Sequence, residues 1–183
     1  NVVTNRKKTN YLDASYGIGS FHTHKADLNA QYIFRNGLTI RPTLGINYSK
    51  NDYKMRGVEL WDETARKFLP QDRKRFHDAY LSLLGHVEVG FTDKWWTDEF
   101  FVSASYHQTD KELQTGQVQT RVIGMADKQT KAWSVGARYQ KRAFLLEGLN
   151  ANFSFSHTWD HSIATDTAHR QYDWNGEIEI GRA

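Results

Sequence analysis

The 183-residue sequence predicts an all-β fold: an antiparallel, up-and-down transmembrane β-barrel, of which this chain supplies about eight strands. Apolar and polar residues alternate in segment after segment, and connections of short and long length follow one another. The clearest segment is Leu38–Ser49, which alternates without exception. A period of two gives a strand one apolar and one polar face, and about 9–11 residues of tilted strand cross a bilayer.

Composition agrees with this class and excludes others. The chain has 24 Lys and Arg against 21 Asp and Glu, which gives no indication of nucleic-acid binding. No apolar run approaches the roughly 18 residues of a transmembrane helix. About half of the residues of a membrane-barrel strand face a polar interior, so a mean hydropathy of −0.71 is compatible with a membrane barrel.

The predicted strands share this alternation and are separated by turn residues, such as Asn36-Gly37, a strong hairpin signal. They cover residues 10–16, 21–34, 38–55, 72–91, 100–107, 131–142, 149–159 and 172–180. Short turns are expected near residues 36, 95 and 146, and long polar loops at 56–71, 109–130 and 160–170.

Aromatic residues collect near both kinds of connection. Those near the short turns are Tyr32, Phe34, Phe91, Trp95 and Trp96, and those near the long loops are Tyr48, Tyr106 and Trp159. Outer-membrane barrels have short periplasmic turns, long extracellular loops and two aromatic girdles. In a soluble sandwich or lipocalin-like barrel, nothing requires loop length and aromatic residues to differ between the two ends of the strands. Such a soluble β-protein is the alternative to the membrane barrel.

Several stretches resemble the barrel of TonB-dependent outer-membrane receptors of the Bacteroidetes type. They include Ser15-Tyr16-Gly17, Thr92-Asp93-Lys94-Trp95-Trp96 and Tyr172-Asp173-Trp174-Asn175-Gly176-Glu177. The resemblance implies a barrel of about 22 strands that imports a scarce nutrient, such as an iron chelate, haem, cobalamin or a glycan, across the bacterial outer membrane. Residues 1–183 would then be a partial barrel domain, without the plug and the remaining strands.

The same resemblance implies the partners. These are the lipid bilayer and lipopolysaccharide, the protein's own plug and remaining barrel strands, the TonB complex through an N-terminal segment that is not in this chain, and a surface lipoprotein. Two alternatives stay open: a small self-contained eight-strand anchor or adhesin, and a soluble lipocalin-like binding protein.

Candidate site residues follow from the assignment of faces. Residues predicted to face the lumen and plug are Arg41, Tyr80, His86, Glu88, Glu177 and Glu179. Candidates at the substrate entrance are Trp61, Trp159 and His161. Arginine binds phosphate bidentately, so the candidates for lipopolysaccharide contact are Arg66, Lys67, Arg73, Lys74 and Arg75. No catalytic constellation, metal site or cofactor is predicted, and an enzyme is not expected.

Overall fold

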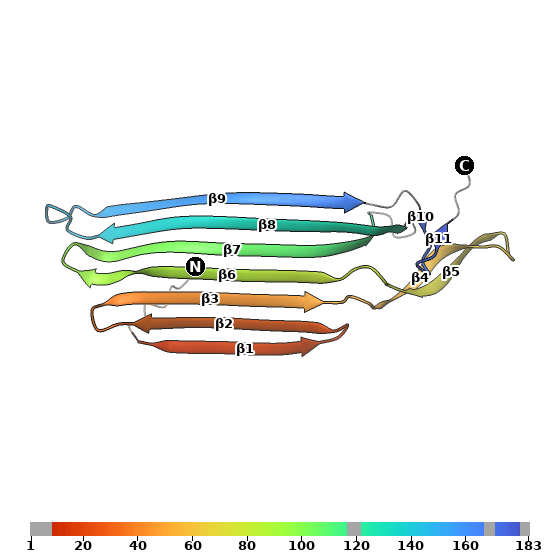
Figure 1. Cartoon of the computed structure of the whole chain (residues 1–183), viewed down its shortest axis with the longest axis horizontal. Helices are drawn as coiled ribbons and strands as arrows, with labels where there is room; N and C mark the ends of the chain where they lie inside the picture. Colours follow the sequence, from red (N-terminus) through yellow and green to blue (C-terminus); the bar gives the residue numbers. More distant parts are fainter. Residues whose placement is uncertain (1–8, 117–121, 167–170, 180–183) are drawn as a thin grey trace.

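The computed structural model describes residues 9–116, 122–166 and 171–179, and these residues form strands and connections without a helix. Seven strands make one antiparallel sheet in the order β1-β2-β3-β6-β7-β8-β9 (Figure 1). Their bounds are β1 Tyr11–Gly19, β2 Thr23–Ile33, β3 Leu38–Ser49, β6 Tyr80–Lys94, β7 Thr97–Thr115, β8 Val122–Lys141 and β9 Ala151–Asp166. Two small hairpins lie beyond one end of this sheet: β4 (Lys54–Asp62) with β5 (Lys67–Lys74), and β10 (Gln171–Tyr172) with β11 (Ile178–Glu179).

The pairing register keeps the apolar positions of all seven strands on one face. Leu44 of β3 lies opposite Leu28 of β2 and Gly85 of β6. Gly85 in turn lies opposite Tyr106 of β7, which lies opposite Trp133 of β8. Because side chains directly opposite one another point to the same side of a sheet, the alternation of each strand adds to a single apolar face and a single polar face.

The predicted antiparallel all-β fold is confirmed, and so are the short turns near residues 36, 95 and 146. The first predicted long loop, residues 56–71, is wrong as a loop because it folds as most of the β4–β5 hairpin. Its turn is held by the Asp62 carboxylate, which accepts hydrogen bonds from the backbone N–H groups of Thr64 (2.9 Å) and Ala65 (2.8 Å). The predicted strand 72–91 correspondingly begins at Tyr80, since residues 72–74 belong to β5.

The second and third predicted loops are largely strand. β7 continues to Thr115, β8 starts at Val122, and β9 continues to Asp166. In these extensions polar residues pair with polar residues, such as Glu112 with Asp127. The extensions of β7 and β9 are mostly polar, whereas that of β8 begins with the mostly apolar residues 122–126, so alternation of hydropathy is lost although the backbone ladder continues.

The predicted eighth strand, residues 172–180, is also wrong within the described part of the chain. The Asp173 carboxylate accepts hydrogen bonds from the backbone N–H groups of Asn175 (2.8 Å) and Glu177 (2.9 Å), and this turns the chain into the β10–β11 hairpin. Trp174 then packs into a small apolar cluster with Val58 of β4 and Val122 of β8. The cluster joins the two small hairpins to the extension of β8.

The seven-stranded sheet of the described residues has two edges, β1 and β9, and does not close on itself. Every residue of β1 is exposed, and so are nearly all residues of β9. None of the described residues belongs to a helix that is long and apolar enough to span a membrane.

Substitution of Gly90 on β6 tests how closely the backbones of β6 and β7 approach each other. A Cβ atom at Gly90 would clash with the Phe100 carbonyl oxygen, whereas one at Gly85 would meet only Leu44, at 3.9 Å. We expect Gly90→Ala to lower the free energy of unfolding by about 1–3 kcal/mol, as other overpacked sites do. Gly85→Ala is the matched control and should change it by less than about 0.5 kcal/mol. Urea unfolding of the refolded protein measures both, and equal effects would contradict the described register.

Candidate functional site

The polar face of the sheet carries a cluster of charged residues built around Phe101 of β7. The Phe101 side chain is only 1% exposed, although it lies on the polar face. The Arg41 guanidinium lies 4.2 Å from the centre of its ring, and that of Arg138 lies 5.6 Å away. Cations within about 6 Å of a ring are attracted to its π face, so the two arginines cover Phe101 from β3 and β8.

Two carboxylates connect these arginines. Glu99 accepts a hydrogen bond from Arg138 (2.9 Å) and lies 3.9 Å from Arg41. Glu88 lies 3.5 Å from Arg41 and 3.8 Å from Arg138. The cluster therefore ties β3, β6, β7 and β8 together and balances two positive charges against two negative ones.

The structure places four of the six predicted lumen-facing residues on this one face. Arg41 and Glu88 belong to the cluster, His86 lies 3.8 Å from Glu88, and Tyr80 lies farther along β6 with the same orientation. The predicted position of Glu177 on the polar face of the sheet is corrected, because Glu177 lies exposed in the β10–β11 hairpin. The side chain of Glu179 lies outside the described residues.

Sequence reasoning missed Phe101, Glu99 and Arg138 as members of the site. Arg138 and Phe101 sit at polar-face positions of their alternating segments, so parity alone could have assigned their direction. Their mutual contact could not be found in this way, because it depends on the register between β7 and β8.

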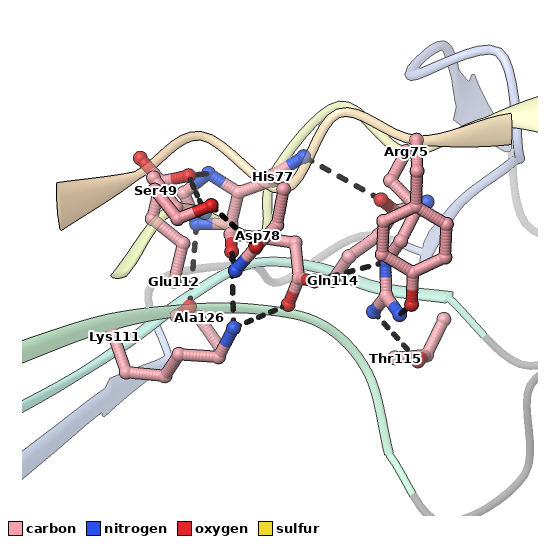
Figure 2. Close-up of polar contacts among 12 residues, drawn as sticks. Ser49, Arg75, His77, Asp78, Lys111, Glu112, Gln114, Thr115 and Ala126 are labelled. Carbon is pink, nitrogen blue, oxygen red and sulfur yellow. Dashed lines mark hydrogen bonds and ion pairs between the residues drawn. The ribbon is translucent and has the colours of Figure 1, made fainter. Parts of the chain in front are cut away.

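A second polar network lies at the opposite end of the sheet, where residues 75–79 lead from the β4–β5 hairpin into β6 (Figure 2). Gln114 is fully buried, and its side-chain oxygen accepts the backbone N–H of Phe76 (2.9 Å). His77 lies 3.2 Å from Asp127 and 3.6 Å from Glu112 through its two ring nitrogens. These contacts fasten the segment across the extended ends of β7 and β8.

The charged residues of the same segment complete the network. Lys111 donates to the Asp78 carboxylate (2.6 Å), and the Nε of Arg75 lies 3.2 Å from the same carboxylate. Arg75 also donates to the Tyr53 hydroxyl (2.9 Å). Since each charge is matched in this partly buried site, we assign the network a structural role in fixing the β4–β5 hairpin.

The five candidates for lipopolysaccharide contact all lie on the β4–β5 hairpin or directly after it. Arg66 occupies the turn, Lys67, Arg73 and Lys74 belong to β5, and Lys74 lies 2.9 Å from Asp52. Arg75 is engaged in the network of Figure 2, so it is not available as a free phosphate ligand in this conformation. The contact of the other four residues with lipopolysaccharide stays a prediction.

The structure does not bring the three substrate-entrance candidates together. Trp61 lies near the end of β4 and packs edge to face against Phe68, with ring centres 5.4 Å apart. Trp159 and His161 lie on β9, on the apolar face of the sheet, and Trp159 lies opposite Trp133. Only Trp61 therefore lies on a connection between strands of the sheet.

The chemistry open to these sites is binding through charge, hydrogen bonds and aromatic surfaces. In the described ranges no group of three or more His, Cys, Asp or Glu side chains is arranged to hold a metal ion. No family model, no curated protein and no solved structure was found to match the chain.

Replacing Gln114 tests the network of Figure 2. Gln114→Leu keeps the volume but leaves the Phe76 amide without its acceptor, and a buried unpaired polar group costs about 1–3 kcal/mol. We expect hydrogen exchange at the amides of Phe76 and His77 to accelerate by about tenfold or more, since about 1.4 kcal/mol corresponds to a factor of ten. Exchange in β3, for example at Ile46, is the internal control, and unchanged exchange at Phe76 would contradict the assigned role.

Acid should loosen the attachment of β5. The hydrogen bond from Lys74 holds the pKa of the Asp52 carboxyl below its usual 3.8, with further contributions from Lys50 and His22. Because this pKa is lowered in the folded state, the stabilisation is present at neutral pH and is lost as pH falls below about 4. We expect the hydrogen-exchange protection of the Arg75 amide, which donates to the Tyr53 carbonyl (3.0 Å) beside Lys74, to fall relative to that of β3 amides when the pH is lowered from about 7 to about 3. Asp52→Asn should remove this dependence, and a dependence that persists in the variant would contradict it.

Proposed function

We propose that this chain forms part of the wall of an outer-membrane β-barrel, with its apolar face against lipid and its polar face inward. The observation that carries this proposal is the apolar face that extends across all seven strands of the sheet and that on β9 also includes His157, opposite Val135. Several large side chains on it are more than half exposed, including Leu44 (52%), Trp133 (60%) and Phe155 (51%). A contiguous apolar patch of this kind marks contact with a membrane or another protein.

The distribution of aromatic residues on this face supports lipid as the contact. Phe91, Phe100, Tyr139 and Phe153 are consecutive cross-strand neighbours near the short turns. Tyr106, Trp133 and Trp159 are consecutive neighbours in a second row. On β8 the rows lie about 20 Å apart, and Leu38 to Tyr48 spans about 34 Å on β3. Barrel strands are tilted by about 35–45°, so the 34 Å along β3 correspond to about 24–28 Å across the membrane, close to the apolar band of about 25 Å that outer-membrane barrels present.

The open edges are consistent with a larger barrel. An edge strand exposes unpaired N–H and C=O groups, and hydrocarbon offers them no hydrogen-bond partner. In a bilayer β1 and β9 would therefore each pair with a further strand. The resemblance to TonB-dependent receptors supplies the specific form of the proposal, a plugged barrel of about 22 strands that draws energy from the TonB complex.

The function we infer is import of a scarce nutrient: an iron chelate, haem, cobalamin or a glycan. In this arrangement the cluster around Phe101 faces the plug, and the β4–β5 hairpin stands at the outer entrance. The β7 and β8 extensions would project from the membrane on the same side, because they continue beyond the Tyr106–Trp133 row.

Adjacent residues of β3 test the assignment of faces. Arginine on the lipid side of a barrel costs about 2–4 kcal/mol at the bilayer midplane. We expect Leu44→Arg to show a loss of this size in a folding assay with lipid vesicles, and Thr43→Arg to show far less. Equal losses at the two positions would contradict the proposed faces.

Lipid contact itself is tested with a fluorescent probe on Leu44→Cys, since the chain has no cysteine of its own. Brominated lipids should quench this probe and should leave the same probe on Thr43→Cys unaffected. An apolar face covered by protein, as in a soluble lipocalin-like fold, would leave both probes unquenched.

The transport part of the proposal is tested in cells that lack the complete protein. They should lose energy-dependent uptake of one of the four nutrient classes, and expression of the protein should restore it. Unchanged uptake of all four would contradict the proposal.

A further inference from the structure

The apolar face ends at different levels on different strands. Toward the long connections, its last aromatic residue on β3 is Tyr48, and the register continues from Tyr48 through Leu81 and Asp110 to Gln129 on β8. Gln129 is polar, and the last aromatic residue on the same face of β8 is Trp133, four residues closer to the short turns. The outer limit of the apolar face therefore shifts by four residues from β3 to β8.

Strand tilt accounts for this shift. In a barrel whose strands tilt by about 35–45°, a membrane boundary crosses neighbouring strands with an offset of about 3.4–4.8 Å for each strand spacing of about 4.8 Å. β3 and β8 are separated by three strand spacings. The boundary is therefore expected to shift by about 10–14 Å, which is about three to four residues of a strand, and the outer limit of the apolar face shifts by this amount.

The inner limit of the apolar face should shift equally, because the two boundaries of a bilayer's hydrocarbon core are parallel. On β3 the inner limit is Leu38, and the register continues from Leu38 through Phe91 and Phe100 to Tyr139 on β8. Four residues beyond Tyr139 the chain has left β8 and entered the turn formed by residues 142–150. The membrane boundary on β8 is therefore expected within this turn.

The turn 142–150 has the composition that such a position requires. Leu145 is 83% exposed and Leu146 is 70% exposed. The exposed apolar side chains of the turn are Phe144, Leu145, Leu146 and Leu149. The turn between β2 and β3 lies at the same end of the sheet (Figure 1) but consists of Arg35, Asn36 and Gly37. The apolar turn thus occurs where the boundary is shifted, and the polar turn where it is not.

The turn between β6 and β7 lies between these two positions and shows an intermediate extension. Trp96 packs edge to face against Phe91 and Phe100, with ring centres 6.1 and 5.7 Å apart. The apolar face therefore continues into this turn by one aromatic residue.

The backbone holds the apolar side chains of the turn 142–150 in place. The Phe144 N–H donates to the Leu149 carbonyl (2.7 Å), and the Arg142 N–H donates to the Asp98 carboxylate (2.8 Å). Leu145 has a φ of 67°, in the left-handed region that large side chains rarely adopt. Such strained residues concentrate at positions where a side chain serves a function, and here the strained residue exposes a leucine.

We propose that the apolar side chains of the turn 142–150 lie among the phospholipid acyl chains at the inner boundary of the membrane. From Trp133 to Tyr139 the apolar face measures about 20 Å along β8, or about 14–16 Å across the membrane at the same tilt, and the turn extends it toward the usual 25 Å or so. Lipid is the partner because the turn continues the lipid-facing surface at the level that strand tilt requires. This inference deepens the proposed function and rests on it.

Cysteine labelling of the complete protein in lipid vesicles tests the position of the turn. Leu146→Cys is compared with Arg35→Cys, because both side chains are exposed in turns at the same end of the sheet. Only a thiolate reacts with a maleimide, and hydrocarbon disfavours the charged form. We expect a membrane-permeant maleimide to label Leu146→Cys at least about ten times more slowly than Arg35→Cys in vesicles, and at an equal rate in urea. Leu149→Cys replaces Leu146→Cys if that variant fails to fold.

Brominated lipids identify what covers the turn. A fluorescent probe on Leu146→Cys should be quenched most by bromine near the headgroup end of the acyl chains, whereas a probe on Leu44→Cys should be quenched most by bromine near the chain ends. Slow labelling of Leu146→Cys without quenching would mean that protein covers the turn, and it would overturn the contact with lipid.

The failure of this proposal can be told apart from the failure of the barrel wall. Equal labelling of Leu146→Cys and Arg35→Cys, together with quenching at Leu44, would overturn the position of the turn and leave the wall intact. Absence of quenching at both Leu44 and Leu146 would overturn the wall and the turn together.

Discussion

The structure depends on one constraint: the register of six antiparallel strand pairs keeps the same parity from β1 to β9. A slip of one residue at any pair would move a whole strand's apolar side chains to the polar face. Gly85 and Gly90 illustrate the two consequences on β6, since Gly85 lies in the apolar face between Leu44 and Tyr106, and Gly90 lies in the polar face opposite Phe101. Both the apolar surface and the charged cluster exist only because this parity is maintained.

The two faces are stabilised by different physics. None of the described residues forms a layer over the apolar face. Its side chains become buried only when a partner covers them, and we propose that this partner is lipid. The polar face already contains a site of low exposure, where Arg41 and Arg138 cover Phe101 and the carboxylates Glu88 and Glu99 neutralise them. Removal of one of these side chains would leave the charge of its partner partly buried and unpaired. The free-energy cost of that unpaired charge is larger than the net stabilisation that the ion pair provides.

The end of the sheet with the long connections has a different construction. There the strands continue without alternation of hydropathy, and a small cluster of buried apolar residues joins Val58, Val122 and Trp174 from three separate segments. Gln114 of β7 and His77 hold residues 75–79, which connect β5 to β6, against the extended ends of β7 and β8. These connections therefore fold as small hairpins and extended strands. Within the β4–β5 hairpin, Trp61 and Phe68 pack edge to face.

The sequence by itself determined the all-β class, the directions of the side chains in strands such as Leu38–Ser49, and the short turns, because period-two alternation and turn residues are local properties. It also identified Arg41, His86 and Glu88 as residues of one face. Only the tertiary structure decided that residues 56–71 form a hairpin, that β7 and β8 extend beyond their alternating segments, and that residues 172–179 leave the sheet. It also decided that Phe101, Glu99 and Arg138 meet Arg41, since contacts between strands depend on register and on side chains distant in sequence, which no local pattern contains.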